Sequence, residues 1–152
     1  MTTEKHPAVR VLRAFQQEMH DWEWRMIRED FGDLESLEPD EIDAEIAKRN
    51  HCMFVELQEI FEKYCEAGVK ARRIADSESM HYGGDEPDYN PKTESILNVE
   101  EHENSVIVET KMKHNFQFEL RYEIVKRDKK WLLRDNRKSR SSKSKKWADW
   151  DL

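Results

Sequence analysis

Cysteine is scarce in this chain of 152 residues, where only Cys52 and Cys65 occur. Their spacing of thirteen residues fits neither a paired metal-binding knuckle nor a redox motif. Both fall inside a stretch with helical periodicity, so we expect two buried or half-buried thiols. This cysteine usage favours a reducing cytosol.

Long hydrophobic runs are missing as well. No stretch of about 18 consecutive apolar residues occurs, which argues against a membrane-spanning helix. The first seven residues contain no apolar core of the kind that a secretory signal peptide needs. We therefore expect a cytoplasmic protein that does not use a membrane.

Motifs of catalysis and cofactor binding are absent too. The sequence contains neither His-Glu-x-x-His nor Gly-x-Ser-x-Gly. The adjacent residues Gly83 and Gly84 indicate a turn and not a phosphate-binding loop. These absences predict a protein with no catalytic site, no metal and no cofactor.

Charge, by contrast, is plentiful and unevenly placed. Residues 1–69 hold 17 Asp and Glu against 8 Lys and Arg, whereas residues 126–146 hold 11 Lys and Arg against 2 Asp. We therefore predict a dipolar molecule, with an acidic helical half and a basic end to its sheet.

Two parts of the first half carry apolar residues at every third or fourth position, which predicts amphipathic helices. The first begins at Pro7, a residue suited to the first turn, and runs to about Glu29. The second follows Pro39 and has an acidic first turn. Because polar residues 49–51 interrupt its apolar stripe, we predict a bend near Asn50 and hence three helices in all.

The C-terminal third, from residue 94 to about residue 140, alternates between apolar and polar residues. Its apolar runs are Ile96, Leu97 and Val99; Val106, Ile107 and Val108; Phe116, Phe118, Leu120, Tyr122 and Ile124; and Trp131, Leu132 and Leu133. A period of two indicates antiparallel strands with one buried face. Short polar breaks join the runs, so we predict one curved meander covered by the helices, an α+β domain over residues 1–140.

Two segments fall outside this pattern. Residues 77–89 are rich in turn residues and predict a loop, which in a compact domain is often functional. Residues 141–152 form a basic tail that contains Trp147 and Trp150. Such a tail can grip nucleic acid through phosphate contacts and stacking, or its tryptophans can fold back on the domain. The acidic character of the whole chain favours the second interpretation.

The order of elements resembles the nuclear transport factor 2-like fold, a cone of helices packed in a curved antiparallel sheet. The stretch 8–15, Ala-Val-Arg-Val-Leu-Arg-Ala-Phe, looks like the first helix of that fold. The stretch 121–133, ending in Lys-Trp-Leu-Leu, looks like its penultimate hairpin. The tyrosine-bearing loop 82–89 before the meander is similar to that of immunity proteins from bacterial polymorphic toxin systems. This resemblance extends to about Arg140.

The resemblance implies a protein that binds a cognate toxin and neutralises it by occlusion, without catalysis. Two acidic surfaces are the candidates for that contact, since many toxins attack nucleic acid with a basic cleft. The first lies between the predicted helices, at Asp33, Glu35, Glu38, Asp40, Glu41, Asp43 and Glu45. The second is the loop with Asp85, Glu86, Asp88 and the aromatic anchor Tyr89. The alternative for both surfaces is an ordinary solvated face without a binding role.

The same fold also serves isomerase-like enzymes and small-molecule-binding proteins, and this is the alternative function. Such an enzyme needs a carboxylate of raised pKa, or a tyrosine and a carboxylate, in an apolar pocket. Tyr122 shares the parity of the inward apolar residues and is the one candidate there. A homodimer through the outer face of the sheet is a further expectation, and the overall negative charge disfavours nucleic acid as a partner.

Overall fold

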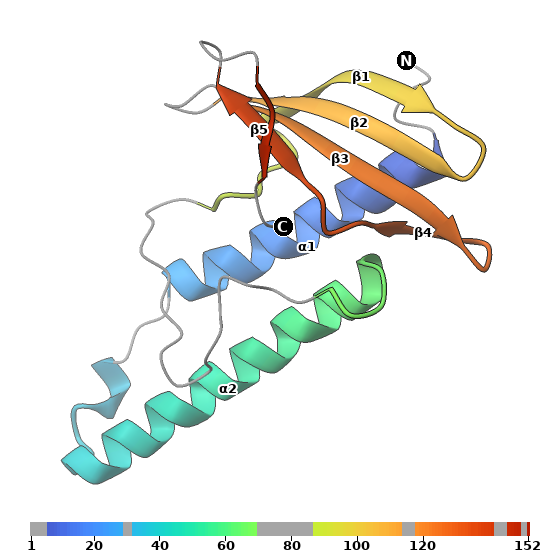
Figure 1. Cartoon of the computed structure of the whole chain (residues 1–152). Coiled ribbons are helices and arrows are strands. Elements are labelled where there is room, and N and C mark those ends of the chain that lie inside the picture. Colours follow the sequence, from blue (N-terminus) through green and yellow to red (C-terminus); the bar gives the residue numbers. More distant parts are fainter. Residues whose placement is uncertain (1–5, 29–31, 70–86, 114–117, 142–145, 150–151) are drawn as a thin grey trace.

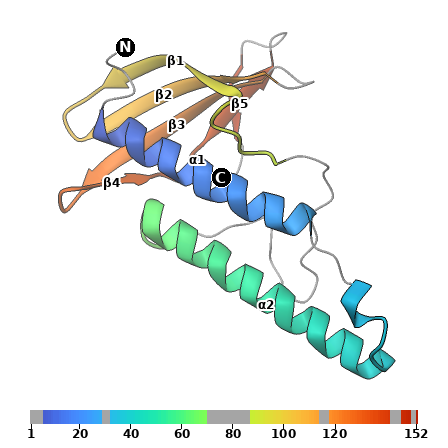
Figure 2. The same cartoon turned by 180° about the vertical axis from the view of Figure 1, so that it is seen from behind.

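The computed structural model describes residues 6–28, 32–69, 87–113, 118–141, 146–149 and 152. Two helices, α1 (Pro7–Ile27) and α2 (Pro39–Tyr64), flank the short 3-10 helix η2 (Gly32–Leu34). The strands are β1 (Glu94–Glu101), β2 (Ser105–Met112), β3 (Phe118–Arg127), β4 (Lys130–Leu133), β5 (Lys138–Ser141) and β6 (Ala148–Asp149). The sheet forms one layer, α1 crosses its inner face, and α2 lies on the other side of α1 (Figures 1 and 2). The predicted α+β class is confirmed.

Helix α1 starts where the sequence indicates. His6 is the N-cap, and its Nδ1 accepts a hydrogen bond of 3.1 Å from the Ala8 N–H. Pro7 follows at the first helical position, where its missing N–H costs nothing. The buried stripe of the helix faces the sheet and α2, and consists of Ala8, Val9, Leu12, Phe15, Gln16, Met19, Trp22 and Glu23.

Helix α2 is one continuous helix, so the predicted bend near Asn50 and the third helix are wrong. The segment from residue 40 to residue 64 contains neither glycine nor proline, and nothing in it interrupts the backbone hydrogen bonds. Polar residues at positions 49–51 mark a change in burial and not a break. Every buried residue of α2 lies in its second half: Met53, Leu57, Ile60 and Phe61.

The sheet is an antiparallel meander in the order β1-β2-β3-β5-β6, with β4 also paired to β3. Its register pairs Val106 with Ile124 and Val108 with Tyr122, which places the alternating apolar residues on the inner face. An irregularity between Ile96 and Asn98 leaves Leu97 half exposed. The β3–β4 turn places Asp128 and Lys129 at positive φ, as a tight hairpin turn requires.

The expectation of two buried or half-buried thiols holds for one cysteine only. Cys65 is buried at the end of α2, whereas Cys52 is exposed at the middle of the helix. No helix in the described ranges is both long and apolar enough to cross a membrane.

Candidate functional site

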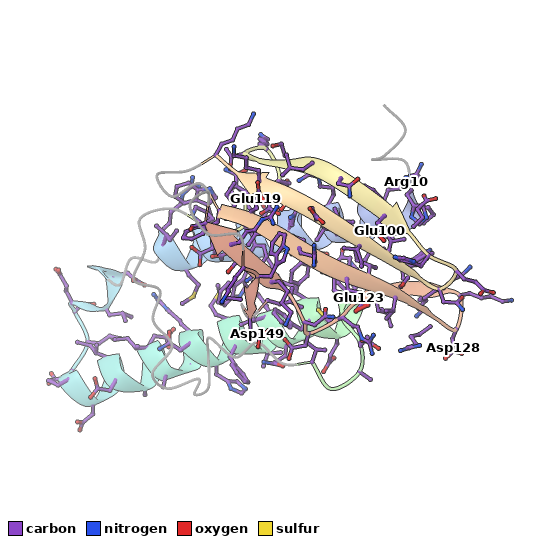
Figure 3. All side chains as sticks on the ribbon, turned by 45° about the horizontal axis from the view of Figure 1, so that its top comes forward. Arg10, Glu100, Glu119, Glu123, Asp128 and Asp149 are labelled. Atoms are coloured by element: carbon purple, nitrogen blue, oxygen red, sulfur yellow. The ribbon has the colours of Figure 1, made fainter. Side chains whose placement is uncertain are left out.

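The predicted charge asymmetry appears in space as two opposite ends of the molecule. The first half of α2 and η2 project beyond the sheet, and we call residues 32–52 the acidic arm (Figure 1). The β3–β4 hairpin with its basic residues 126–130 lies at the other end, where Asp128 marks its tip (Figure 3). The molecule therefore carries an electric dipole along its length.

The α2 part of the acidic arm has little support from the core, and Leu34 of η2 is the one buried residue of the arm. No residue of α2 before Met53 is buried, and Ile42 and Ile46 are only half buried. From residue 32 to residue 47 the arm holds seven Asp and Glu and no Lys or Arg. Of the predicted contact residues, the structure exposes Asp33, Glu35, Glu38, Asp40, Glu41 and Asp43 along this arm and half buries Glu45.

One arginine neutralises part of the arm. Arg49 pairs with Asp33 at 2.7 Å and with Glu45 at 3.3 Å, and so ties η2 to α2. The hydrogen bond from Arg49 holds the pKa of the Asp33 carboxyl below its usual value. Glu41 accepts a long hydrogen bond of 3.4 Å from the Glu38 N–H at the helix start. Among the described residues no cation pairs with the remaining carboxylates of the arm.

The second predicted surface is only partly described. Asp85 and Glu86 lie outside the described residues, and Asp88 is exposed. Tyr89 is 1% exposed and packs edge-on against Phe15 with ring centroids 5.3 Å apart. A buried ring cannot anchor a partner, so we remove Tyr89 from the contact surface.

The backbone around Tyr89 is held by two polar residues of α1 that the sequence analysis missed. Glu23 accepts hydrogen bonds from the N–H groups of Asp88 at 3.0 Å and of Tyr89 at 3.2 Å. His20 Nδ1 lies 2.8 Å from the Tyr89 carbonyl oxygen. Glu23 falls on the apolar face of α1. A carboxylate among apolar residues was the sequence signal that could have indicated this buried hydrogen-bonding role.

A buried polar cluster sits inside the cone around Glu94, at the start of β1. Its Oε2 accepts hydrogen bonds from Gln16 Nε2 at 2.7 Å, Thr110 Oγ1 at 2.7 Å and the Tyr122 hydroxyl at 2.9 Å. Arg137, which is also buried, has its guanidinium 5.8 Å from the centre of the Tyr122 ring. Sequence analysis found Tyr122 and missed the others, although Gln16 on the apolar stripe of α1 was a signal.

Burial is the main cause of the pKa shifts of Glu94 and Tyr122 in this cluster. Removal from water raises the pKa of the Glu94 carboxyl, and the hydrogen bonds from Thr110 and Tyr122 together with the charges of Arg137 and Arg13 offset part of that rise. Burial and the nearby Glu94 charge raise the pKa of Tyr122 well above 10.

A buried carboxylate beside a tyrosine is the pair that the isomerase-like alternative requires. Here Glu94 is 2% exposed and one of its oxygens already accepts three hydrogen bonds. Arg13 of α1 also donates to the Glu94 carbonyl oxygen at 2.8 Å. The cluster therefore fastens α1 to β1, β2 and β3. Among the described residues, no group of three or more His, Cys, Asp or Glu is placed to hold a metal ion.

A surface groove of about 520 Å³ lies between the two helices. It is lined by Glu18, Asp21 and Arg25 of α1 and by Glu56, Glu59, Ile60 and Lys63 of α2. The four α2 residues follow the acidic arm along the same helix, whereas the other three belong to α1.

The described C-terminal residues return along the edge of the sheet, where β6 pairs with β5 and Asp149 is labelled in Figure 3, and Leu152 joins the hydrophobic core. The Trp147 ring lies 4.4 Å from the Arg121 guanidinium and 4.3 Å from that of Arg140. Leu152 is buried, and Lys138 pairs with Asp149. The predicted homodimer through the outer face of the sheet stays a prediction.

Many cations of the basic end are bound to carboxylates. Arg127 and Arg134 both pair with Glu66, at 3.3 Å and 3.2 Å. Arg140 pairs with Glu119 at 2.6 Å. Cations held in this way offer less to a phosphate backbone than the sequence suggests.

Comparison with known proteins gives one finding. The family model described as "NTF2 fold immunity protein" matches residues 7–151, and so includes the C-terminal tail that the sequence resemblance left out. No curated protein matches, and neither does any solved structure. A match over nearly the whole chain, on helices and a meander in the order of that fold, shows that this chain belongs to the family of NTF2 fold immunity proteins.

Proposed function

We propose that this immunity protein binds a cognate protein toxin in the cytoplasm and neutralises it by covering its active site, without catalysing a reaction. Membership of the family assigns a role in toxin immunity. The mechanism, the absence of catalysis and the contact surface are our inference. The main observation in support of this inference is the acidic arm.

The α2 part of the arm, Pro39 to Cys52, is suited to contact a partner because it holds no buried residue. A helix segment without buried residues contributes little packing, so its composition is free to match another surface. At 1.5 Å per residue the segment from Pro39 to Cys52 extends about 20 Å. Its first turns carry Asp40, Glu41 and Asp43, which pair with no cation among the described residues. Such a surface fits the basic cleft of a toxin that acts on nucleic acid, and speeds association through long-range attraction.

The buried cluster supports binding over catalysis. A general base must reach its substrate, and Glu94 is enclosed by Gln16, Thr110 and Tyr122. The pair therefore stabilises the cone that presents the arm.

The test is co-purification of the tagged protein with the product of the neighbouring reading frame, followed by rescue of growth when that product is expressed. We expect a stable complex and rescue. The variant Glu35→Gln/Asp40→Asn/Asp43→Asn should weaken binding at least tenfold, with a lower association rate and less salt dependence. Glu62→Gln/Glu100→Gln/Glu103→Gln removes the same charge elsewhere and should bind as the parent does. Failure of the parent protein to bind or to rescue would overturn the proposal.

A further inference from the structure

The groove between α1 and α2 combines opposite charges with an apolar floor. Four carboxylates and two cations line it, and Ile60, only 8% exposed, forms its apolar part. This composition is negative overall. It differs from the arm because side chains of two helices converge on one hollow.

Two ion pairs cross the groove and join the helices. Arg25 Nη1 of α1 lies 2.6 Å from Glu56 Oε2, and Lys63 Nζ of α2 lies 3.3 Å from Glu18 Oε2. All four side chains are substantially exposed. Exposed pairs of this kind exchange readily with other partners because water screens them.

Two of the carboxylates have acceptor capacity to spare, whereas the buried Glu56 Oε2 already has Arg25 Nη1 as its ionic partner at 2.6 Å. Asp21 accepts one hydrogen bond from Gln17 Nε2 at 3.0 Å. Neither Asp21 nor Glu59 pairs with a cation among the described residues. An arginine is the side chain that best satisfies such a site, since its guanidinium carries five donors in a planar fork.

The apolar floor fits the same side chain. Arginine and lysine lay their methylene stems along apolar surface and keep the charged head among polar groups. Ile60 lies beside the carboxylates of Glu56 and Glu59 on α2. A stem on Ile60 would therefore place a cationic head between the two helices.

We propose that this groove receives an arginine or lysine side chain from a loop of the toxin. The incoming cation takes over Glu56 from Arg25 and reaches Asp21 or Glu59. The proposal rests on the proposed function, and it locates the centre of the interface at the groove with the acidic arm beside it.

The test measures the dissociation constant of the complex with the neighbouring-frame protein for three variants. Asp21→Asn/Glu59→Gln should raise the dissociation constant at least tenfold. Glu62→Gln/Glu103→Gln removes two charges outside the groove and should leave the dissociation constant within about twofold of the parent value. Arg25→Gln removes the internal competitor for Glu56 and should lower the dissociation constant. Thermal unfolding checks that each variant is folded.

The outcomes separate the two proposals. If the parent protein binds and rescues growth while Asp21→Asn/Glu59→Gln binds equally tightly, the groove is not the contact and toxin binding through the arm still stands. If Arg25→Gln weakens binding as much as the carboxylate variant does, the cross-groove pair is structural and the exchange is wrong. If the parent does not bind at all, both proposals fall.

Discussion

The hydroxyl of Tyr122 donates a hydrogen bond of 2.9 Å to the carboxylate of Glu94 inside the cone. The two residues are 28 positions apart and belong to strands that do not pair with each other. Their contact joins the start of the meander to its central strand. Because both groups are buried, the bond bears directly on stability.

We expect Tyr122→Phe to lower the free energy of unfolding by about 1–3 kcal/mol, since a buried carboxylate loses one charge-assisted donor. Urea denaturation measures the change. Tyr64→Phe, at a half-buried tyrosine of α2, is the matched control and should cost less. An equal loss in the two variants would contradict a special role for the Glu94 contact.

The raised pKa of Glu94 predicts a pH dependence of stability. Since the folded state holds this proton more tightly than the unfolded chain, the contribution is complete below about 4.5, the ordinary pKa, and is lost as pH rises through the folded value. The stability advantage of the parent protein over Glu94→Gln should therefore shrink as pH increases from 4 to 7. Glu103→Gln controls for the loss of an exposed carboxylate. An advantage that grows with pH would show that the folded pKa is lowered.

The acidic arm should open more readily than the rest of α2. Amides of residues 43–52 belong to the half without buried side chains, whereas residues 57–64 include Leu57, Ile60 and Phe61 of the core. Native-state hydrogen exchange should show at least tenfold faster exchange in the first group. Equal protection along the helix would mean that another contact holds the arm. Binding of the toxin should slow exchange in the first group.

The two cysteines should react differently. Burial raises the pKa of the Cys65 thiol to about 12, and the nearby Asp135 charge adds to this, whereas Cys52 is exposed. A thiol reagent should therefore modify Cys52 in the native protein and Cys65 only after unfolding in urea. Cys52→Ser should abolish the native reaction. Rapid native modification of Cys65 would contradict its burial.

Much of the fold could be predicted because local periodicity reports burial. The helix start at Pro7, the inward parity of Val106, Val108, Leu120 and Ile124, and the helix start at Pro39 all appear in the structure. The bend near Asn50 was predicted wrongly because a polar interruption was taken for a break in the helix. The backbone stays helical there because the segment contains neither glycine nor proline.

The candidate site was less predictable because its parts are far apart in the sequence. Parity identified Tyr122, but it does not reveal that Glu94 and Gln16 meet it. Tyr89 lay in a loop that read as exposed and instead packs on Phe15, which only the path of the folded chain decides.

The sequence by itself determined the helix starts, the strand pattern with its buried face and the separation of charge, because each depends on residues that are near one another along the chain. Only the tertiary structure decided which polar residues meet inside the cone, that half of α2 projects from it as an acidic arm, and that α1 and α2 form a charged groove. Those features arise where distant segments come together, and hydrogen-bonding and packing geometry in three dimensions select them.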